Sequence, residues 1–353
     1  MNLQDLGYNE AWETSRREMG LERFDVGRVV AEHKERYHVL TEKGGMDAEV
    51  TGNLRFVARG REDFPAVGDW VALTIHDTDF SLIQGILPRF SVISREAVGQ
   101  FGEIQIIGTN IDDAFLIQAV DRDFNLNRLE RYLTLCHASR VRPMIVLTKT
   151  DLISEEALSS ILDRVRKGMP EIPVMAISNE TEAGYETLKN SLEKGRTYCM
   201  LGSSGVGKST LLNHLSGNTV MKTDAISAST NKGRHVTSHR ELIVLANGSI
   251  LIDNPGMREV GIGEAGEGLE TTFDPVFTLA KKCRFRDCSH THEAGCAVLE
   301  AIATGEMDRR SYESYLKMEK EKNFFESSAK ERHKKDKDFG RMMKNYHKGR
   351  VGR

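Results

Sequence analysis

Short segments in which apolar and polar residues alternate fill the first quarter of the chain and predict β-strands. They span residues 26–31, 37–41, 54–57, 70–75 and 80–87, and turn signals such as Gly44-Gly45 and Gly52-Asn53 separate them. Five short strands within about 70 residues are typical of a small barrel, and the OB-fold is the commonest one that fits. We therefore expect an OB-fold β-barrel over residues 25–98, behind a short helical or loosely ordered lead-in over residues 1–24.

From about Phe101 the pattern changes to apolar strands that alternate with amphipathic helices. Predicted strands cover residues 114–119, 144–147, 174–177, 197–201 and 249–252, and predicted helices cover 126–138 and 155–167. This alternation is typical of a parallel sheet covered by helices. After residue 259 the chain leaves this α/β domain for a cysteine-bearing loop and two further predicted helices, 296–304 and 310–326.

A glycine-rich segment follows the predicted strand 197–201 and precedes a helix-like run. The segment, Gly202-Ser203-Ser204-Gly205-Val206-Gly207-Lys208-Ser209, fits GxxxxGK(S/T), and we expect nucleotide contacts from it and from Thr210. Backbone N–H groups of such a loop cradle phosphate oxygens, Lys208 can reach the β and γ phosphates, and the Ser209 hydroxyl can ligate Mg²⁺. The flanking pattern disfavours the alternative, a plain glycine-rich turn.

The other motifs of a GTPase are present in a rotated order. Thr148-Lys149-Thr150-Asp151 fits the base-reading motif (N/T)KxD but precedes the phosphate loop, whereas in most GTPases it follows. Downstream come Thr237, a candidate Mg²⁺ and γ-phosphate contact, and then Asp253-Asn254-Pro255-Gly256, which fits DxxG. A circularly permuted P-loop GTPase domain over residues 101–264 accounts for this order, because a parallel sheet stays intact when its termini move to another surface loop.

Ser178-Asn179 follows the predicted strand 174–177, where GTPases place a second contact to the base. An ordinary serine at the end of a strand explains the first of these residues equally well.

Three of the five cysteines are crowded between residues 283 and 296, which favours a metal site over a disulfide framework. Cys283, Cys288 and Cys296 supply three thiolates, and either His290 or His292 supplies an imidazole, a tetrahedral set suited to Zn²⁺. Four protein ligands leave no open position, so we expect a structural zinc that stabilises a small helical domain over residues 265–329.

Charge is unevenly distributed along the chain. The formal net charge is −3, but residues 330–353 hold ten Lys or Arg against three acidic residues, a net +7 that leaves −10 for the remainder. This tail is either a basic arm for phosphate backbones or a solvated solubility tail. Two interpretations are likewise open for six barrel residues: they form a basic and aromatic surface that faces RNA, or they are scattered surface charges and aromatic side chains of the core. These residues are Arg28, Tyr37, Arg55, Phe56, Arg59 and Arg61.

With these motifs the chain resembles, over nearly its whole length, the ribosome small subunit-dependent GTPase A family of circularly permuted GTPases. The residues that carry the resemblance, besides the rotated order, are Gly233-Arg234-His235-Val236-Thr237, the run Cys283 to His290, and Glu293-Ala294-Gly295-Cys296. The chain departs from the family at Thr148, where Asn is usual, and at Val236, which interrupts a threonine run. The resemblance implies His290 as the fourth zinc ligand, and late maturation of the small ribosomal subunit, with its 16S rRNA, as the setting.

Several roles follow for a GTPase of this kind. Lys149 would pack on guanine, Asp151 would accept hydrogen bonds from its edge, and Ser209, Thr237 and Asp253 would hold Mg²⁺, Asp253 through water. Met257 stands where many GTPases have a water-orienting Gln, so we expect slow basal turnover that the small subunit stimulates. His235 is the candidate water-orienting group, although it could instead contact RNA or shape its loop.

No signal peptide or membrane span is evident, since no apolar stretch approaches the roughly 18 residues a span needs. We expect a cytoplasmic, monomeric protein that binds GTP and GDP. An RNA-binding module in which hydrolysis is not the main output is the alternative function.

Overall fold

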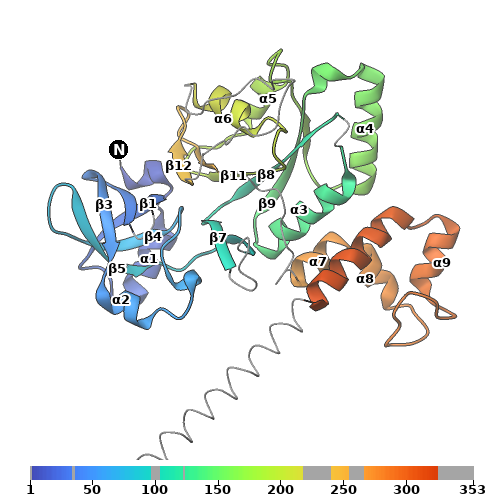
Figure 1. Cartoon of the computed structure of the whole chain (residues 1–353), viewed down its shortest axis with the longest axis horizontal. Helices are drawn as coiled ribbons and strands as arrows, with labels where there is room; N and C mark the ends of the chain where they lie inside the picture. Colours follow the sequence, from blue (N-terminus) through green and yellow to red (C-terminus); the bar gives the residue numbers. More distant parts are fainter. Residues whose placement is uncertain are drawn as a thin grey trace, which may run out of the picture.

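Three structural units follow one another along the chain in the computed structural model (Figure 1). The structure describes residues 2–33, 36–96, 104–121, 124–217, 240–253 and 266–324. Among these residues, none of the helices combines the length and the apolar character that a membrane crossing needs.

The first unit is a closed five-stranded barrel, as predicted. Its strands pair in the order β1-β2-β3-β5-β4, and β4 returns to β1 to close the barrel. The strands are β1 (Asp25–His33), β2 (Arg36–Thr41), β3 (Gly44–Val50), β4 (Trp70–Ile75) and β5 (Phe80–Ile86). Inward-facing side chains such as Val39, Leu73 and Ile83 are fully buried and form its core.

The predicted strand at residues 54–57 is wrong: this segment is helix α2 (Gly52–Val57), and the third strand is β3, which begins at the predicted turn Gly44-Gly45. Thr51 starts the helix because its hydroxyl accepts a hydrogen bond from the Leu54 N–H at 3.3 Å. In β3, the buried Met46, Ala48 and Val50 alternate with Asp47 and Glu49, so the segment carries the period-two pattern of a strand, and the prediction missed it because Gly44-Gly45 was interpreted as a turn only.

The lead-in folds against the barrel as η1 (Leu3–Leu6) and α1 (Glu10–Glu18). Arg28 was a candidate RNA contact, but its side chain is 2% exposed and donates to the Leu6 carbonyl at 2.6 Å and to Thr197 Oγ1 at 2.8 Å. Burial lowers its pKa to about 10, although Asp112 and Asp69 oppose the shift. Tyr37 is also buried, so both residues are structural rather than part of an exposed surface.

The second unit is a parallel sheet with one antiparallel edge strand, in the order β10-β9-β8-β11-β13-β12. Its strands are β8 (Asp113–Ala119), β9 (Arg142–Thr148), β10 (Val174–Ala176), β11 (Thr197–Leu201), β12 (Glu241–Val244) and β13 (Ile250–Asp253). This result confirms the predicted βαβ alternation.

Helices cover both faces of this sheet. Leu116 packs on one face with α3 (Leu126–Ala138) and α4 (Glu155–Gly168), whereas its neighbour Phe115 packs on the other with α5 (Tyr185–Asn190) and α6 (Lys208–Ser216). The alternation of buried side chains along β8 therefore places two separate cores on the two sides of one sheet.

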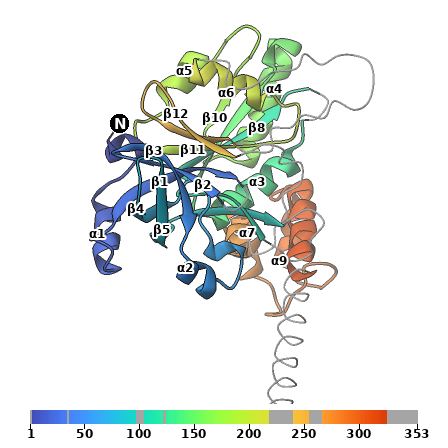
Figure 2. The same cartoon turned by 60° about the vertical axis from the view of Figure 1, so that its left-hand side comes forward.

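The barrel and the α/β unit are joined by backbone pairing. Ala31 of β1 pairs with Glu241 of β12, so the two sheets form one continuous eleven-stranded sheet (Figure 2). A hairpin of β6 (Val92–Glu96) and β7 (Ile104–Thr109) connects the units along the chain, and the sequence pattern did not predict it.

The third unit is helical and packs on α3. It contains α7 (Gly266–Thr272), α8 (Asp274–Ala280), α9 (Ala297–Thr304) and a helix over residues 309–324. A side chain at Gly268 would place its Cβ 2.2 Å from the Thr134 carbonyl oxygen, so glycine is required for α7 to approach α3. Paired charges fix the contact, because Arg310 donates to both carboxylate oxygens of the buried Glu130 at 2.9 and 3.0 Å.

Candidate nucleotide site and metal centre

The phosphate loop connects β11 to α6, as the sequence predicted. Gly205 and Gly207 have φ angles of +81° and +95°, in the left-handed region that favours glycine. A Cβ on Gly202 would lie 2.5 Å from the Ile117 carbonyl oxygen, so this position also excludes a side chain. Ser204 and Ser209 are exposed at the mouth of the loop, and Val206 is buried beneath it. The loop therefore has the backbone conformation that a phosphate-binding concavity needs.

Lys208, the first residue of α6, folds back over this loop. Its ammonium donates to the carbonyl oxygens of Gly202 and Ser203, each at 2.7 Å. Burial lowers the pKa of Lys208 to about 8, although the negative charge of Asp253 opposes the shift. The ammonium is thus held at the mouth of the loop in an environment that favours an incoming anion.

We expect nucleotide affinity to fall as pH rises above about 8, because bound phosphates should raise the pKa of Lys208 and make binding take up a proton. Below that pH the amine is protonated in both states and affinity should be constant; by about pH 9 it should be roughly tenfold weaker. Fluorescent GDP titrations from pH 7 to about 9 measure this. Lys208→Arg is the control, because a guanidinium does not deprotonate and its curve should stay flat. A flat curve for the parent protein would contradict the role of Lys208.

The base-reading motif at the end of β9 is hydrogen-bonded to the phosphate loop. The hydroxyl of Thr148, which is fully buried, donates to the Val206 carbonyl at 2.6 Å. Asn179 Nδ2 donates to the Gly207 carbonyl at 3.2 Å, and Asn179 Oδ1 accepts from the Tyr185 hydroxyl at 2.7 Å. Thr148 and Asn179 therefore hold the two halves of the site together, and their direct contact with the nucleotide stays a prediction.

Asp151 and Ser178 meet beside these contacts. The Asp151 side chain is exposed, and its Oδ1 accepts a hydrogen bond from Ser178 Oγ at 2.6 Å. Ser178 is 1% exposed, and its Oγ also accepts from the backbone N–H groups of Glu180 and Thr181. With both N–H groups donating to Oγ, the Ser178 proton is directed to Asp151. This hydrogen bond holds Oδ1 of Asp151 in place, while the side chain of Asp151 stays exposed to solvent.

Lys149 adopts a left-handed backbone conformation, with φ of +60°, at the start of η3 (Thr150–Leu152). Its ammonium lies 3.0 Å from Asp121 Oδ2, and both side chains are about one quarter exposed. The ion pair holds the aliphatic part of Lys149 at the edge of the site.

Asp253 ends β13 at the same edge of the sheet as the phosphate loop, because β11 and β13 are parallel neighbours. Asp253 is 6% exposed and its negative charge acts on Lys208, and Ser209, the next residue of α6, is exposed. An acidic oxygen and a hydroxyl at one sheet edge suit Mg²⁺. His235, Thr237 and Gly256, the other predicted site residues, lie outside the described residues.

The structure adds Arg128 of α3, which sequence reasoning missed. Its Nη1 donates to Ser203 Oγ in the phosphate loop at 3.3 Å. The sequence signal was weak, since Arg128 is one of several charged residues at the start of an amphipathic helix, and only the parallel pairing of β8 with β11 brings that helix to the loop.

The four predicted metal ligands come together in the third unit. The ligand atoms of Cys283, Cys288, His290 and Cys296 all lie within 4.8 Å of one another, an arrangement that could hold a metal ion. His290 Nδ1 is 3.5 Å from Cys283 Sγ and 3.4 Å from Cys296 Sγ, and these two sulfurs are 3.8 Å apart. These separations suit bonds of about 2.0–2.3 Å from one tetrahedral ion.

His292, the competing imidazole, contacts Thr291 Oγ1 at 2.8 Å and is outside this cluster. Glu293 shapes the turn that separates the two histidines, because its carboxylate accepts from the backbone N–H groups of Ser289, Thr291 and His292. The pKa of Cys283 is lowered: burial opposes the shift, but N–H groups at the start of α9 donate to the sulfur and favour the thiolate.

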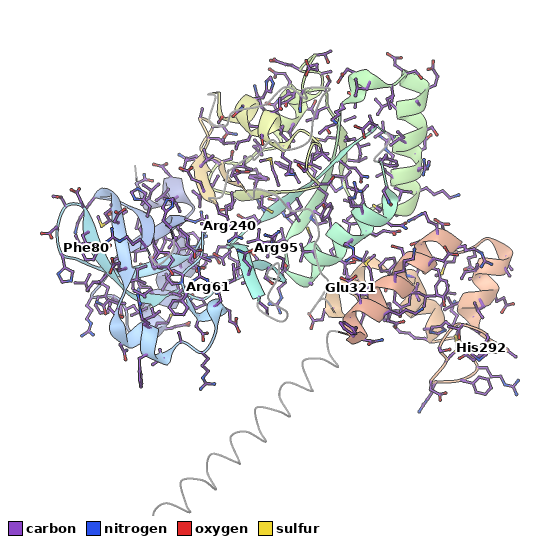
Figure 3. All side chains as sticks on the ribbon, in the orientation of Figure 1. Arg61, Phe80, Arg95, Arg240, His292 and Glu321 are labelled. Atoms are coloured by element: carbon purple, nitrogen blue, oxygen red, sulfur yellow. The ribbon has the colours of Figure 1, made fainter. Side chains whose placement is uncertain are left out.

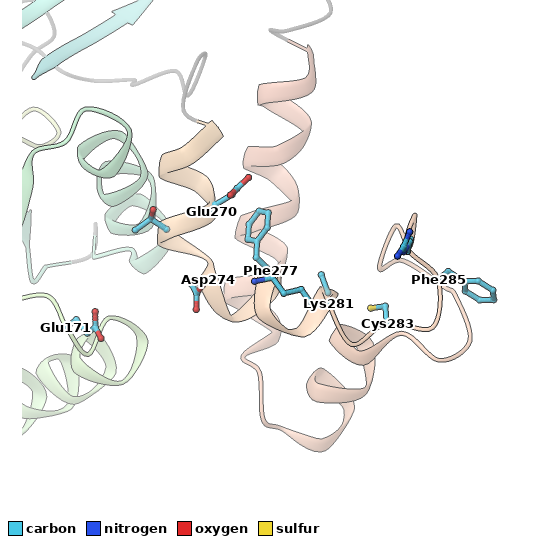
Figure 4. A pocket seen from close by; sticks show the side chains of 10 residues that line it. Glu171, Glu270, Asp274, Phe277, Lys281, Cys283 and Phe285 are labelled. Carbon is cyan, nitrogen blue, oxygen red and sulfur yellow. The ribbon is translucent and has the colours of Figure 1, made fainter.

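An open cleft of about 940 Å³ lies beside the metal cluster, between the end of α4 and the helices α7 and α8 (Figure 4). Glu171, Glu270 and Asp274 line one part of it, and Lys281 and Phe285 line another. The residues of the phosphate loop do not line it, so it is separate from the nucleotide site.

A phosphate loop on a parallel sheet, with its base-reading motif upstream in sequence, defines a circularly permuted P-loop GTPase. The family model described as RsgA GTPase matches residues 86–263, and the chain belongs to this family. The small ribosomal subunit biogenesis GTPase RsgA 2 of Lactiplantibacillus plantarum is 42% identical over 299 residues, which cover 85% of this chain and 84% of that protein. The small ribosomal subunit biogenesis GTPase RsgA of Opitutus terrae is 38% identical over 334 residues, covering 92% and 90%.

Two solved structures have a fold similar to that of this chain. YjeQ from Thermotoga maritima superposes with a TM-score of 0.64 at 27% identity, covering 83% of this chain and 96% of that one. YloQ, described as a circularly permuted GTPase, matches with a TM-score of 0.60 at 24% identity, covering 84% and 94%, and supports the fold.

Proposed function

We propose that this GTPase acts on the maturing small ribosomal subunit, binds its 16S rRNA, and hydrolyses GTP when docked there. The names of the relatives support the setting. The observation that carries the nucleotide part is the pair of hydrogen bonds from Thr148 and Asn179 to the phosphate loop, which join a base-reading surface to a phosphate-reading one. Because these contacts make one site from two distant segments, base identity and phosphate binding are coupled.

Guanine recognition is assigned to Asp151. Its exposed carboxylate would accept hydrogen bonds from the N1–H and N2–H₂ groups of guanine, donors that adenine does not present in that pattern. Ser178 holds this carboxylate in place, and the aliphatic part of Lys149, fixed by Asp121, would pack on the ring.

For hydrolysis, Lys208 would exchange its two loop carbonyls for phosphate oxygens and balance the charge that develops on them. Ser209, Thr237 and Asp253 would hold Mg²⁺, which neutralises phosphate charge when bound. His235 is proposed to orient the attacking water, because Met257 has no group that can do so.

The metal of the Cys283, Cys288, His290 and Cys296 cluster is proposed to be one structural Zn²⁺, because three thiolates and an imidazole leave no open position. We propose domains at residues 25–98, 101–264 and 265–329, a lead-in at 1–24 and a basic tail at 330–353, in a cytoplasmic monomer.

We expect slow basal hydrolysis that purified small subunits raise strongly, and His235→Ala should keep GTP affinity while losing most of the stimulation. Phosphate release with and without subunits measures this, and His214→Ala, a half-buried histidine on α6, is the matched control. If subunits stimulate His235→Ala as they do the parent, the ribosome supplies the water-orienting group. If subunits leave the turnover of the parent unchanged, hydrolysis is not coupled to the subunit. That result would support the alternative function, an RNA-binding module in which hydrolysis is not the main output.

A further inference from the structure

Four cations and an aromatic ring lie on the surface of the metal loop, which we define as residues 281–296. The cations, all of them exposed, are Lys281, Lys282, Arg284 and Arg286. Phe285 lies between the two arginines in sequence and is 46% exposed. Figure 3 places the loop, through its His292, at the outer end of the third unit, whereas Glu321 lies beside α3, where it pairs with Arg131. The loop is therefore the part of this unit that a large partner can reach.

The cations of the metal loop have no charged partner within the protein. Among the residues that the structure describes, none of the four takes part in an ion pair. The loop itself holds two acidic residues. The carboxylate of Glu293 is used internally, since it accepts from three backbone N–H groups of the loop, and only Asp287 is exposed. Four exposed cations therefore face solvent against one exposed carboxylate.

The third unit separates its charges. Residues 266–324 hold nine Lys or Arg and eleven Asp or Glu, yet residues 281–286 hold four of these cations and no acidic residue. Figure 4 shows the ring of Phe285 pointing away from the acidic side chains Glu171 and Glu270, which line the other part of the cleft. A polyanion is therefore attracted to the metal loop and repelled from the remainder of the unit.

Phe285 offers a flat apolar surface among these cations. The Arg284 guanidinium lies over its ring, with Cζ 5.4 Å from the ring centroid. Since nearly half of this residue is exposed, a second planar group can stack on the ring. Nucleobases stack on aromatic side chains in this way, and a nearby arginine adds a cation–π contribution. A base inside a duplex has both faces covered by its neighbours, so only an unpaired nucleotide can offer one.

Backbone contacts hold the metal loop in shape. The Arg284 N–H donates to the Gly295 carbonyl at 3.0 Å and joins the two ends of the loop. The Tyr312 hydroxyl donates to the His290 carbonyl at 2.5 Å and anchors the loop to the helix over residues 309–324. A surface that is already ordered loses less conformational entropy when it binds a partner.

We propose that the metal loop binds single-stranded RNA, with an unpaired base stacked on Phe285 and the flanking phosphates held by Arg284, Arg286 and the two lysines. Guanidinium groups match phosphate oxygens in paired hydrogen bonds, and the ammonium groups add positive charge. An acidic protein surface would satisfy the cations but would leave the exposed ring without a planar partner, so RNA fits better. This inference rests on the proposed function, because it gives the RNA contact of that function a place in the third unit.

A tryptophan reporter in the full chain tests the stacking. The chain has two tryptophans, Trp12 and Trp70, and both are buried, so Phe285→Trp adds an exposed indole. A single-stranded RNA of about 12 nucleotides should quench its fluorescence in a saturable way, because a stacked base quenches indole emission. The same RNA annealed to its complement should bind the reporter at least about tenfold more weakly.

Charge removal in the reporter protein tests the phosphate contacts. Arg284→Gln with Arg286→Gln should weaken the RNA affinity roughly tenfold, and should lower the slope of log K against log salt by about 1.4, because each phosphate contact to a single strand contributes about 0.7. Arg140→Gln with Arg166→Gln, two exposed arginines of the α/β unit, is the matched control and should change neither value. Zinc content and basal GTP turnover should equal those of the parent, since Arg284 and Arg286 are neither metal ligands nor part of the phosphate loop.

Phe90→Trp controls for RNA bound elsewhere, because Phe90 of the barrel has the same 46% exposure. Its fluorescence should not depend on Arg284 and Arg286. RNA binding, detected by anisotropy of a labelled strand, without quenching of Phe285→Trp would overturn the site. Equal quenching by duplex RNA would overturn the assignment to unpaired bases, and protection of the reporter by intact subunits alone would point to an acidic protein and overturn the site as well. If the short RNA quenches the reporter while purified subunits neither bind the protein nor stimulate hydrolysis, the proposed function fails and the RNA site stands.

Discussion

Asp151→Asn should reverse nucleotide preference, weakening GTP by at least about 100-fold and making xanthosine triphosphate the better ligand. The carboxylate would accept two hydrogen bonds from guanine, each worth about 1.5–3 kcal/mol because the acceptor is charged. Asparagine keeps the shape but offers an amide N–H₂, which fits the C2 oxygen of xanthine and opposes the guanine N2–H₂. Ser178 can still donate to the remaining side-chain oxygen, so the loop geometry should persist.

Competition of both triphosphates against fluorescent GDP measures this change, with Asp163→Asn, an exposed aspartate on α4, as the matched control. A general loss of affinity for both nucleotides would show that Asp151 supports the fold of the site without reading the base. Unchanged GTP affinity would remove Asp151 from the site.

The permuted GTPase fold could be predicted because its signals are local. The phosphate loop needs glycines at fixed spacing, as Gly205 and Gly207 with positive φ angles demonstrate, and each motif directly follows an apolar strand. The metal ligands could be predicted for the same reason, since Cys283 and Cys296 lie within one loop and the start of one helix.

The structural features that the sequence did not predict depend on contacts between residues far apart in the chain. Arg28 has the sequence character of a surface cation and becomes buried because carbonyl groups of three separate segments, at Leu6, Gly68 and Asn110, accept its hydrogen bonds. Nothing in the sequence indicates that the hydroxyl of Thr148, a predicted nucleotide contact, donates to the Val206 carbonyl. The pairing of Ala31 with Glu241, which joins the barrel to the α/β unit, connects strands far apart in the sequence, and no periodicity within one segment reports it.

Cys288→Ala should remove the metal and unfold the third unit while nucleotide binding persists. Between Cys283 and Cys296 the loop buries no apolar side chain, and Phe285 is 46% exposed. The loop therefore has no core of its own, and the metal must supply its stability. Binding of structural zinc is worth about 10–16 kcal/mol in zinc-finger peptides, which exceeds what the small core around Phe273, Val298 and Tyr315 can replace.

Metal content of the purified protein should fall from about one zinc per chain to almost none, and limited proteolysis should cut residues 266–324 before the remainder of the chain. GDP affinity should stay near that of the parent, because the phosphate loop and Asp151 belong to elements that do not contact the metal loop. His292→Ala is the matched control, since this histidine is exposed, lies two residues from His290 and is outside the cluster. It should keep its zinc. Full zinc content in Cys288→Ala would mean that the ligand set is wrong, and loss of metal without exposure to protease would mean that the helices around Val298 hold the unit together by packing alone.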